Sequence, residues 1–209
     1  GFTNVMVVLD NKPEVKKLTT LLKGTNKKIK IGIRMAINEE AQSSYYTSRM
    51  GIRHNEILDF YNDEVKDNNY VDLKMLHFFV DSGIKDSLYF WEEFNKGLKL
   101  YIDLKKCSKS LNSLNIGGGF PIRNNLGFDY DYNYMANEII KNIKKRCSSE
   151  KIFDPHLFTE FGKYTVGESG AIIFEVLEQK QQNDNENWYL INNSLMNTIP
   201  DAWSIKEKF

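Results

Sequence analysis

Short polar clusters follow apolar, strand-like runs at four places in this sequence, and their side chains are suited to holding a phosphorylated ligand. The clusters are Arg34, Asp81-Ser82-Gly83, the glycines 117–119 and Glu160-Phe-Gly-Lys163. A triple glycine lets backbone N–H groups approach a phosphate closely, although a tight turn uses the same residues. A carboxylate that ends an apolar strand needs a partner or a function, so Glu160 is either a ligand-binding residue or half of a structural ion pair.

The four clusters together describe one kind of ligand. The glycines and Ser82 offer neutral donors, Lys163 offers a cation for a phosphate, and Glu160 offers an anion for a protonated ring nitrogen. A flat aromatic phosphate ester such as pyridoxal phosphate has these groups. An unrelated phosphosugar-binding barrel would explain the glycines but gives Glu160 no ring nitrogen to bind. His77 lies inside an apolar run and is interpreted as a hydrogen-bonded core histidine.

The elements that must position these clusters alternate between strands and helices. We expect strands at 5–9, 29–34, 73–80, 114–116 and 157–160. We expect helices at 13–23, 55–65, after residue 80 and at 131–147, and a polar loop at 38–48. This alternation predicts an α/β fold with a parallel sheet, in which polar residues at the carboxyl ends of the strands form the site.

Five strands are too few for a complete eight-stranded barrel, which takes about 250 residues. We therefore expect residues 1–170 to be the C-terminal part of a TIM-type (β/α)8 barrel. Residues 171–209 are expected to start a β domain, with strands at 172–177 and 188–191 joined by a polar turn at 179–187. The chain begins with Gly1 rather than Met, as a segment of a longer protein would.

Composition excludes several classes of protein. The 28 Lys and Arg balance the 28 Asp and Glu, whereas a general binder of nucleic acid or of anionic membranes has a basic excess. No apolar run is long enough to span a bilayer, and no signal peptide is visible. Cys107 and Cys147 are too few and too far apart for a disulfide framework or a zinc site, so we expect no metal and a cytoplasmic location.

Three ordered segments resemble the alanine-racemase-fold decarboxylases, which include the arginine, ornithine and diaminopimelate decarboxylases. They are Leu76-His-Phe-Phe-Val-Asp-Ser-Gly83, Leu114-Asn-Ile-Gly-Gly-Gly-Phe-Pro121 and Thr159-Glu-Phe-Gly-Lys-Tyr164. A fourth, Thr198-Ile-Pro-Asp-Ala-Trp203, resembles the biosynthetic arginine decarboxylase branch. The resemblance implies pyridoxal 5'-phosphate as cofactor and a basic amino acid as substrate, with arginine converted to agmatine and carbon dioxide in polyamine biosynthesis.

The resemblance also implies roles for individual residues. Glycines 117–119 correspond to those that hold the phosphate, Ser82 lies beside it, Glu160 bonds the pyridine nitrogen, and Arg34 lies near the cofactor. The full set of cofactor-binding residues that it implies is Arg34, Phe79, Ser82, Gly117, Gly118, Gly119, Glu160 and Lys163.

Four positions depart from the family pattern. Phe79 replaces an imidazole that stacks on the cofactor ring, so stacking is kept but no proton can be offered. Asp81 replaces a glycine beside the phosphate serine, where an anion disfavours phosphate unless it points away. Lys163 replaces an arginine, so a bidentate contact becomes a point charge. Arg49 stands at a lysine position of the family.

By the same resemblance, no catalytic residue lies in this chain. The lysine that forms the Schiff base would precede Gly1, and the cysteine that contacts the substrate would follow Phe209. We therefore expect this chain alone to be inactive and the full-length protein to be a homodimeric enzyme. A non-catalytic relative that binds a partner enzyme is the alternative, and the changes at Phe79 and Asp81 motivate it.

Overall fold

The computed structural model describes residues 5–38, 49–80, 82–123 and 128–200. Contacts within these residues divide the chain into two compact units. The first comprises Gly1–Pro121 with Tyr130–Tyr164, and the second comprises Ile122–Asp129 with Thr165–Phe209. The domain boundary expected at 170/171 stays a prediction.

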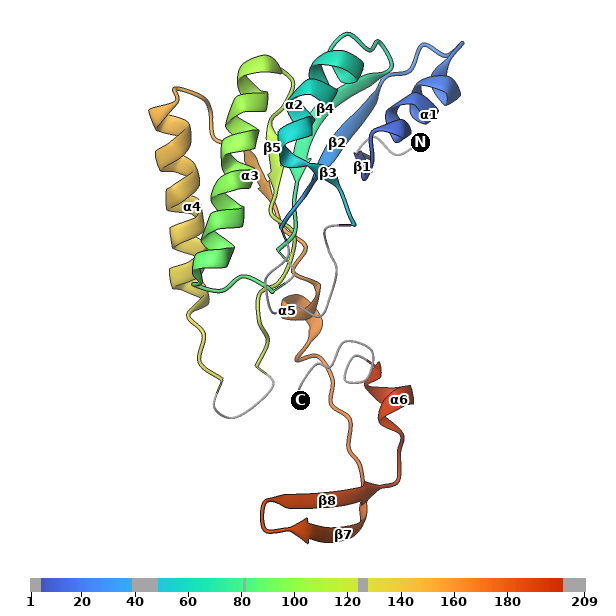
Figure 1. Cartoon of the computed structure of the whole chain (residues 1–209), viewed down its shortest axis with the longest axis vertical. Coiled ribbons are helices and arrows are strands. Elements are labelled where there is room, and N and C mark those ends of the chain that lie inside the picture. The colour runs from blue at the N-terminus through green and yellow to red at the C-terminus, as the bar shows by residue number, and fades with distance from the viewer. Residues whose placement is uncertain (1–4, 39–48, 81, 124–127, 201–209) are drawn as a thin grey trace. The chain divides into compact units, whose positions relative to one another are not determined.

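A parallel sheet forms the centre of the first unit (Figure 1). Its strands are β1 (Val7–Leu9), β2 (Ile29–Ala36), β4 (Val71–His77), β5 (Ser113–Asn115) and β6 (His156–Phe158), and they are adjacent in that order. A short strand, β3 (Ile52–Arg53), also pairs with β2 in parallel. The prediction of five adjacent parallel strands is confirmed.

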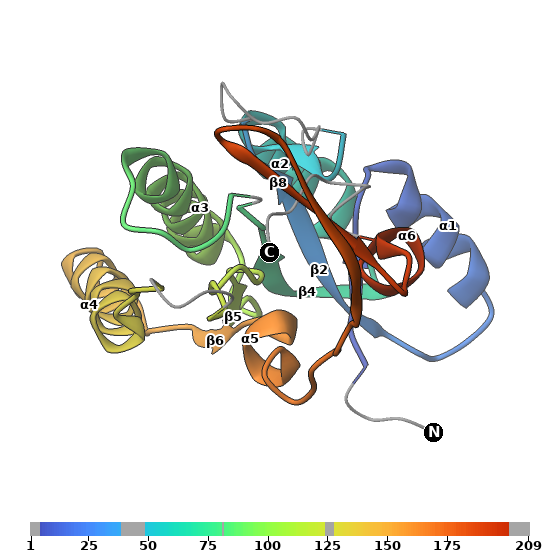
Figure 2. The same ribbon diagram turned by 90° about the horizontal axis from the view of Figure 1, so that it is seen from below.

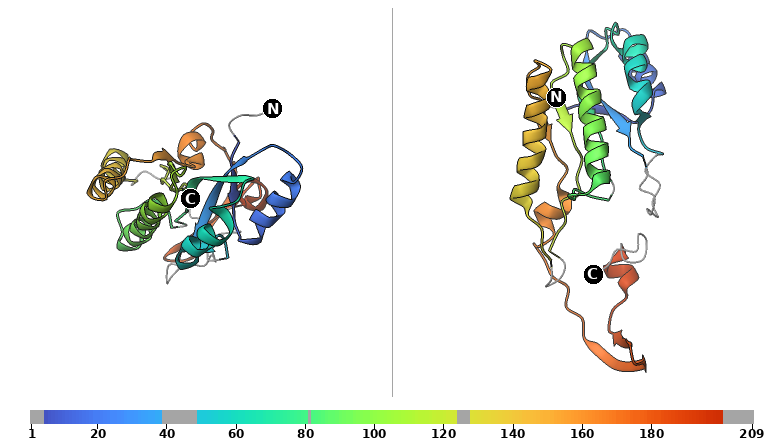
Figure 3. Two further views of the ribbon diagram at one scale, coloured as in Figure 1. Left: turned by 90° about the horizontal axis from the view of Figure 1, so that it is seen from above. Right: turned by 60° about the vertical axis from the view of Figure 1, so that its left-hand side comes forward.

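Helices cover one face of this sheet. Figures 2 and 3 show α1 (Pro13–Leu22), α2 (Ile57–Phe60), α3 (Leu88–Cys107) and α4 (Tyr132–Ser149) arranged in an arc around it. Ser87 begins α3 by accepting a hydrogen bond from the Phe90 N–H at 3.2 Å, and Asp131 begins α4 by accepting one from Tyr134 at 2.9 Å. A short helix, α5 (Gly162–Val166), follows β6.

The register of the strands separates an apolar row from a polar row. Leu9, Ile33, Leu76 and Leu114 occupy one row, are fully buried, and belong to the core that packs against the helices. The residue that follows this row is Arg34 on β2, His77 on β4 and Asn115 on β5. These three residues are also register partners. Because side chains alternate between the faces of a strand, the polar row lies on the face opposite the helices.

Several elements differ from their predicted bounds. β4 ends at His77 instead of residue 80, because the fully buried Phe78 turns toward α3, where a Cβ added to Gly97 would lie 2.5 Å from its ring. β6 ends at Phe158, two residues before Glu160. The helix predicted at 55–65 consists of a 3₁₀ turn, α2 and a π turn. Of the polar loop predicted at 38–48, only Asn38 lies within the described residues.

The second unit contains an antiparallel hairpin of β7 (Val176–Asn183) and β8 (Glu186–Ile191), followed by α6 (Leu195–Thr198). The first strand starts four residues later than predicted and continues through most of the expected turn. The polar stretch from Gln179 therefore forms strand, because the Lys180–Trp188 and Gln181–Asn187 pairs continue the ladder, and the turn is reduced to residues 184 and 185.

In the parts of the chain that the structure describes, none of the helices has the length and hydrophobicity that crossing a membrane requires.

The two cysteines have opposite environments, which gives a direct test of the packing between helices. Cys147 is buried, and burial raises the pKa of its thiol to about 11, whereas Cys107 is exposed at the end of α3. We expect iodoacetamide at pH 8 to modify Cys107 readily and Cys147 only after unfolding, because the thiolate is the reactive form. Mass spectrometry of the alkylated protein checks this, and equal modification of both thiols in the native protein would contradict the packing of α4.

Candidate functional site

A row of polar side chains crosses the carboxyl ends of the strands. Arg34, His77 and Asn115 are register partners on β2, β4 and β5. Asp10 follows β1, and its Oδ1 lies 3.8 Å from Nη1 of Arg34 and accepts a hydrogen bond from the Gly51 N–H at 3.0 Å. Of this row only Arg34 was predicted as a site residue. Asp10, His77 and Asn115 are recognised only from the parallel register, which places them beside Arg34.

Glu160 completes this row from the segment that follows β6. Its Oε1 accepts a hydrogen bond from Nδ2 of Asn115 at 2.9 Å and lies 3.6 Å from Nδ1 of His77. Its side chain is 56% exposed. In the part of the chain that the structure describes, Oε2 of Glu160 makes no hydrogen bond or ion pair. One carboxylate oxygen is therefore held by the protein, and the other is available to a ligand.

The glycine turn is attached directly to Glu160. The Glu160 N–H donates to the carbonyl of Gly117 at 2.8 Å, and the Gly117 N–H donates to Oδ1 of Asn115 at 2.9 Å. A Cβ on Gly118 would collide with the carbonyl oxygen of Glu160. The structure thus brings Gly118 and Glu160 into contact, as their positions after β5 and β6 predicted.

Ser82 belongs to a second turn that lies against the triple glycine. The Ile84 N–H donates to the carbonyl of Gly119 at 2.9 Å, and a Cβ on Gly83 would lie 2.7 Å from the same oxygen. Gly119 has a φ of +110°, which only glycine adopts readily. No hydrogen bond between described residues is donated by the N–H groups of Gly118 or Gly119. Gly118 is buried and Gly119 is half-buried. Buried N–H groups are nearly always paired, so these two are candidates for binding a ligand oxygen.

Phe79 packs on the same turn. A Cβ on Gly117 would lie 2.8 Å from Cδ2 of Phe79, so the ring covers this glycine. Lys163 lies in the first turn of α5, with an exposed side chain. Asp81 lies outside the described residues. The roles of Phe79 and Lys163 in cofactor binding stay predictions.

An aromatic cluster that the sequence reading missed connects the glycine turn to the segment after β6. The rings of Phe120 and Phe161 stack with centroids 4.2 Å apart and planes 20° apart. Tyr132 and Tyr164 contact Phe120, and the Tyr132 hydroxyl donates to the Pro121 carbonyl at 2.7 Å. Phe120 directly follows Gly119, and Phe161 directly follows Glu160. The stack therefore holds the glycine turn and the segment that carries Glu160 close together.

His77 is neutral at neutral pH in this environment. Burial lowers the pKa of its imidazole most, and the neighbouring Arg34 cation lowers it further, while the charge of Glu160, a side-chain hydrogen bond with Asn115 and the charge of Asp10 oppose both effects. The core histidine expected from the sequence is buried as predicted. Its Nδ1 has no hydrogen-bond partner among the described residues, although a side-chain interaction with Asn115 acts to raise the pKa of the imidazole.

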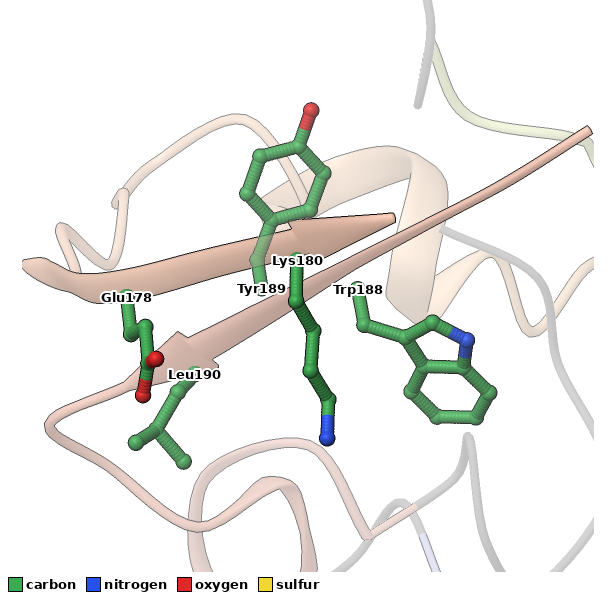
Figure 4. Close-up of a pocket in the computed structure, with 5 residues that line it drawn as sticks. All are labelled: Glu178, Lys180, Trp188, Tyr189 and Leu190. Carbon is green, nitrogen blue, oxygen red and sulfur yellow. The ribbon is translucent and has the colours of Figure 1, made fainter. Parts of the chain in front are cut away.

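A separate pocket lies on the β7–β8 hairpin (Figure 4). It has a volume of about 260 Å³ and is lined by Glu178, Lys180, Trp188, Tyr189 and Leu190. Figure 4 shows the Tyr189 side chain directed away from the other four. None of the predicted site residues lines this pocket, so we place the functional site at the sheet ends of the first unit.

Fold and site together define a class. The strands and helices of the first unit form part of a TIM-type (β/α)8 barrel, and its strand ends carry backbone N–H groups and a carboxylate oxygen that have no partner among the described residues. The chain matches the family described as "Pyridoxal-dependent decarboxylase, pyridoxal binding domain" over residues 3–167. It belongs to this family, whose cofactor is pyridoxal 5'-phosphate.

Individual relatives extend the match. The biosynthetic arginine decarboxylase of Prochlorococcus marinus (strain AS9601) is 25% identical over 98% of this chain and 34% of its own length. The chain thus spans about a third of the length of this curated relative. Diaminopimelate decarboxylase from Helicobacter pylori, solved with L-lysine, has a TM-score of 0.76 at 21% identity, over 97% of this chain and 50% of that one. Lysine decarboxylase from Selenomonas ruminantium has a TM-score of 0.65 at 20% identity, over 91% and 47%.

The contact between Gly118 and Glu160 can be tested by substitution. We expect Gly118→Ala to lower the free energy of unfolding by about 1–3 kcal/mol, because the added methyl group displaces the Glu160 backbone. Urea unfolding measures this. Gly162→Ala is the matched control, since a Cβ there meets nothing within 4 Å. A Gly118→Ala variant as stable as the Gly162→Ala variant would contradict the described contact.

Proposed function

We propose that these residues hold the cofactor of an amino-acid decarboxylase whose substrate is a basic amino acid, with arginine as the first candidate. The observation that carries the proposal is the geometry at Glu160. Its Oε1 is fixed by Asn115, its Oε2 is unpaired among the described residues, and its backbone is bonded to the glycine turn. The alternative interpretation of Glu160 is a structural ion pair, in which a cationic side chain would bind the carboxylate.

The residues present fit the cofactor's two recognisable groups. The N–H groups of Gly118 and Gly119 would donate to the phosphate, and the hydroxyl of Ser82, in the adjoining turn, is a further candidate donor. Lys163 would add a positive charge, and Phe79 would offer an apolar ring face. Arg34 is partly neutralised by Asp10, so its proposed role is to lie near the cofactor, not to bind its phosphate.

When bound, pyridoxal phosphate supplies an electron-accepting ring that allows an amino acid to lose its carboxylate as carbon dioxide. The contribution of this chain is electrostatic. Oε2 of Glu160 would hold the proton on the ring nitrogen, and Asn115 would keep the carboxylate in place by its bond to Oε1. The glycine turn would fix the opposite end of the ligand, so that the ring cannot slide relative to Glu160.

Arginine is favoured as the substrate by the relatives named biosynthetic arginine decarboxylase and by the Pro-Asp-Ala-Trp segment that ends at Trp203. Two of the solved structures of similar fold are named diaminopimelate decarboxylase and lysine decarboxylase, and both of these amino acids carry a second amino group at the end of the side chain. We further propose that the full-length protein is a cytoplasmic homodimer with the conversion of arginine to agmatine as its reaction.

A non-catalytic relative that binds a partner enzyme is the second candidate function. Phe79, which stands where the family has an imidazole, favours it, because a phenyl ring cannot exchange a proton with the substrate. The two functions differ in cofactor binding. Full-length protein that develops a visible absorption band with added pyridoxal phosphate supports the enzyme, and protein that develops none supports the binding function.

Substitution of Glu160 tests the role of its charge. We expect Glu160→Gln to reduce turnover severely, since a neutral amide cannot stabilise a protonated ring nitrogen, and Glu160→Asp to retain more activity. The lost charge-assisted hydrogen bond is worth roughly 1.5–3 kcal/mol in binding, and the loss in rate should be larger because ring charge matters most in the transition state. Carbon dioxide release by the full-length variants at saturating pyridoxal phosphate is the measurement. Near wild-type turnover by Glu160→Gln would make Glu160 an ordinary structural residue.

A substrate panel tests the proposed specificity. We expect the full-length protein to release carbon dioxide from arginine with a kcat/KM at least tenfold above the values for lysine, ornithine and diaminopimelate, a difference of about 1.4 kcal/mol. Each amino acid is assayed at several concentrations so that kcat and KM are separated. A higher kcat/KM for diaminopimelate or lysine would overturn the arginine assignment while leaving the decarboxylase function in place.

A further inference from the structure

His77 carries a buried polar atom that the fold does not satisfy. The side chain is 7% exposed, and its Nδ1 makes no hydrogen bond to any described residue. A buried polar atom without a partner is costly, and such an atom in a native site calls for a functional explanation. The acceptor that faces it is Oε1 of Glu160, at 3.6 Å, which is slightly beyond hydrogen-bond length.

The groups around His77 come from four strands or the segments that follow them. Asp10 and Arg34 approach from β1 and β2, Asn115 is its register partner on β5, and Glu160 follows β6. Asp10 and Arg34 form an ion pair with each other. Asn115 has its amide orientation fixed, because Oδ1 accepts from Gly117 while Nδ2 donates to Glu160. Asp10 is 45% exposed, but its Oδ1 is held by Arg34 and by the Gly51 N–H, so Glu160 is the carboxylate of this group that can move toward His77.

We propose that His77 is a positioning residue for Glu160: its neutral imidazole donates the Nδ1 hydrogen to Oε1 and, together with Asn115, holds the carboxylate so that Oε2 faces the cofactor nitrogen. A shift of less than 1 Å in the carboxylate closes the 3.6 Å separation to hydrogen-bond length. With two hydrogen-bond donors on Oε1, Oε2 is the oxygen of this carboxylate that remains available to a ligand. This inference rests on the proposed function, because it gives Glu160 a ring nitrogen to bind.

A purely structural role for His77 and a role as hydrogen-bond donor predict different effects of substitution. If the imidazole only fills space, any side chain of similar volume should serve. If it donates from Nδ1, then the position of one N–H group decides the result. Asparagine places an amide N–H close to the position of Nδ1, glutamine places one closer to Nε2, and leucine has none. These three substitutions separate packing from donation.

The experiment uses full-length protein loaded with pyridoxal phosphate that is ¹⁵N-labelled in the ring. We expect His77→Leu and His77→Gln to weaken cofactor binding on the order of tenfold, the effect of losing one hydrogen bond to a charged group, and to move the ring ¹⁵N shift toward that of an unprotonated nitrogen. His77→Asn should restore the cofactor affinity to within about threefold of wild type. It should also restore the wild-type ¹⁵N shift. Turnover should fall through kcat, with the KM for the amino acid nearly unchanged.

His156→Leu is the control, because His156 lies on β6, separated from β4 by β5, with an exposed side chain. It should leave the affinity and the ¹⁵N shift unchanged. Thermal unfolding of every variant reports folding, and His77→Gln keeps the test open if His77→Leu does not fold. A protonated ring nitrogen and unchanged affinity in His77→Gln would overturn the inference, as would a His77→Asn variant no better than His77→Gln. If wild-type protein binds no pyridoxal phosphate, the proposed function itself fails and this inference fails with it.

Discussion

The register of the parallel strands determines which residues of this chain can act together. Arg34, His77 and Asn115 are separated by at least 38 positions in sequence, yet they are partners on β2, β4 and β5. The preceding residues of the same strands, Ile33, Leu76 and Leu114, are fully buried. A shift of one residue in any strand would exchange the two rows and place a polar side chain against the helices. The burial of the apolar row therefore also determines which residues form the polar row and on which face of the sheet they lie.

Two turns that contact each other join this row to the triple glycine and so complete the proposed site. The segment after β6 carries Glu160, and the segment after β5 carries the glycines. They are held together by the Glu160–Gly117 backbone bond and by the stack of Phe120 on Phe161. A ligand that contacts both segments needs them at a constant separation. Phe120 directly follows Gly119 and Phe161 directly follows Glu160, so the stacking of the two rings holds these segments at one separation.

Sequence reasoning found the strands and the strand-end clusters because apolar β-branched runs followed by glycines or charges are local patterns. It placed the ends of β4 and β6 two or three residues too late, since Phe78 looks like a strand residue and only its contact with Gly97 of α3 turns it into the core. It missed Asp10 and Asn115, which are ordinary turn and strand-end residues until the register aligns them. It did not find the unpaired Nδ1 of His77, because an unpaired nitrogen is visible only when all of its neighbours are known.

The order of charges along the polar row explains why Glu160 stays available to a ligand. Asp10 is paired with Arg34, so the cation of the row is engaged at the β2 end. His77 lies between this pair and Glu160, and burial keeps its imidazole neutral. A lysine or arginine at that position would form an ion pair with Glu160 and occupy the carboxylate. A neutral imidazole and the amide of Asn115 can orient the carboxylate without cancelling its charge, and a carboxylate that is oriented but not neutralised is what a protonated ring nitrogen requires.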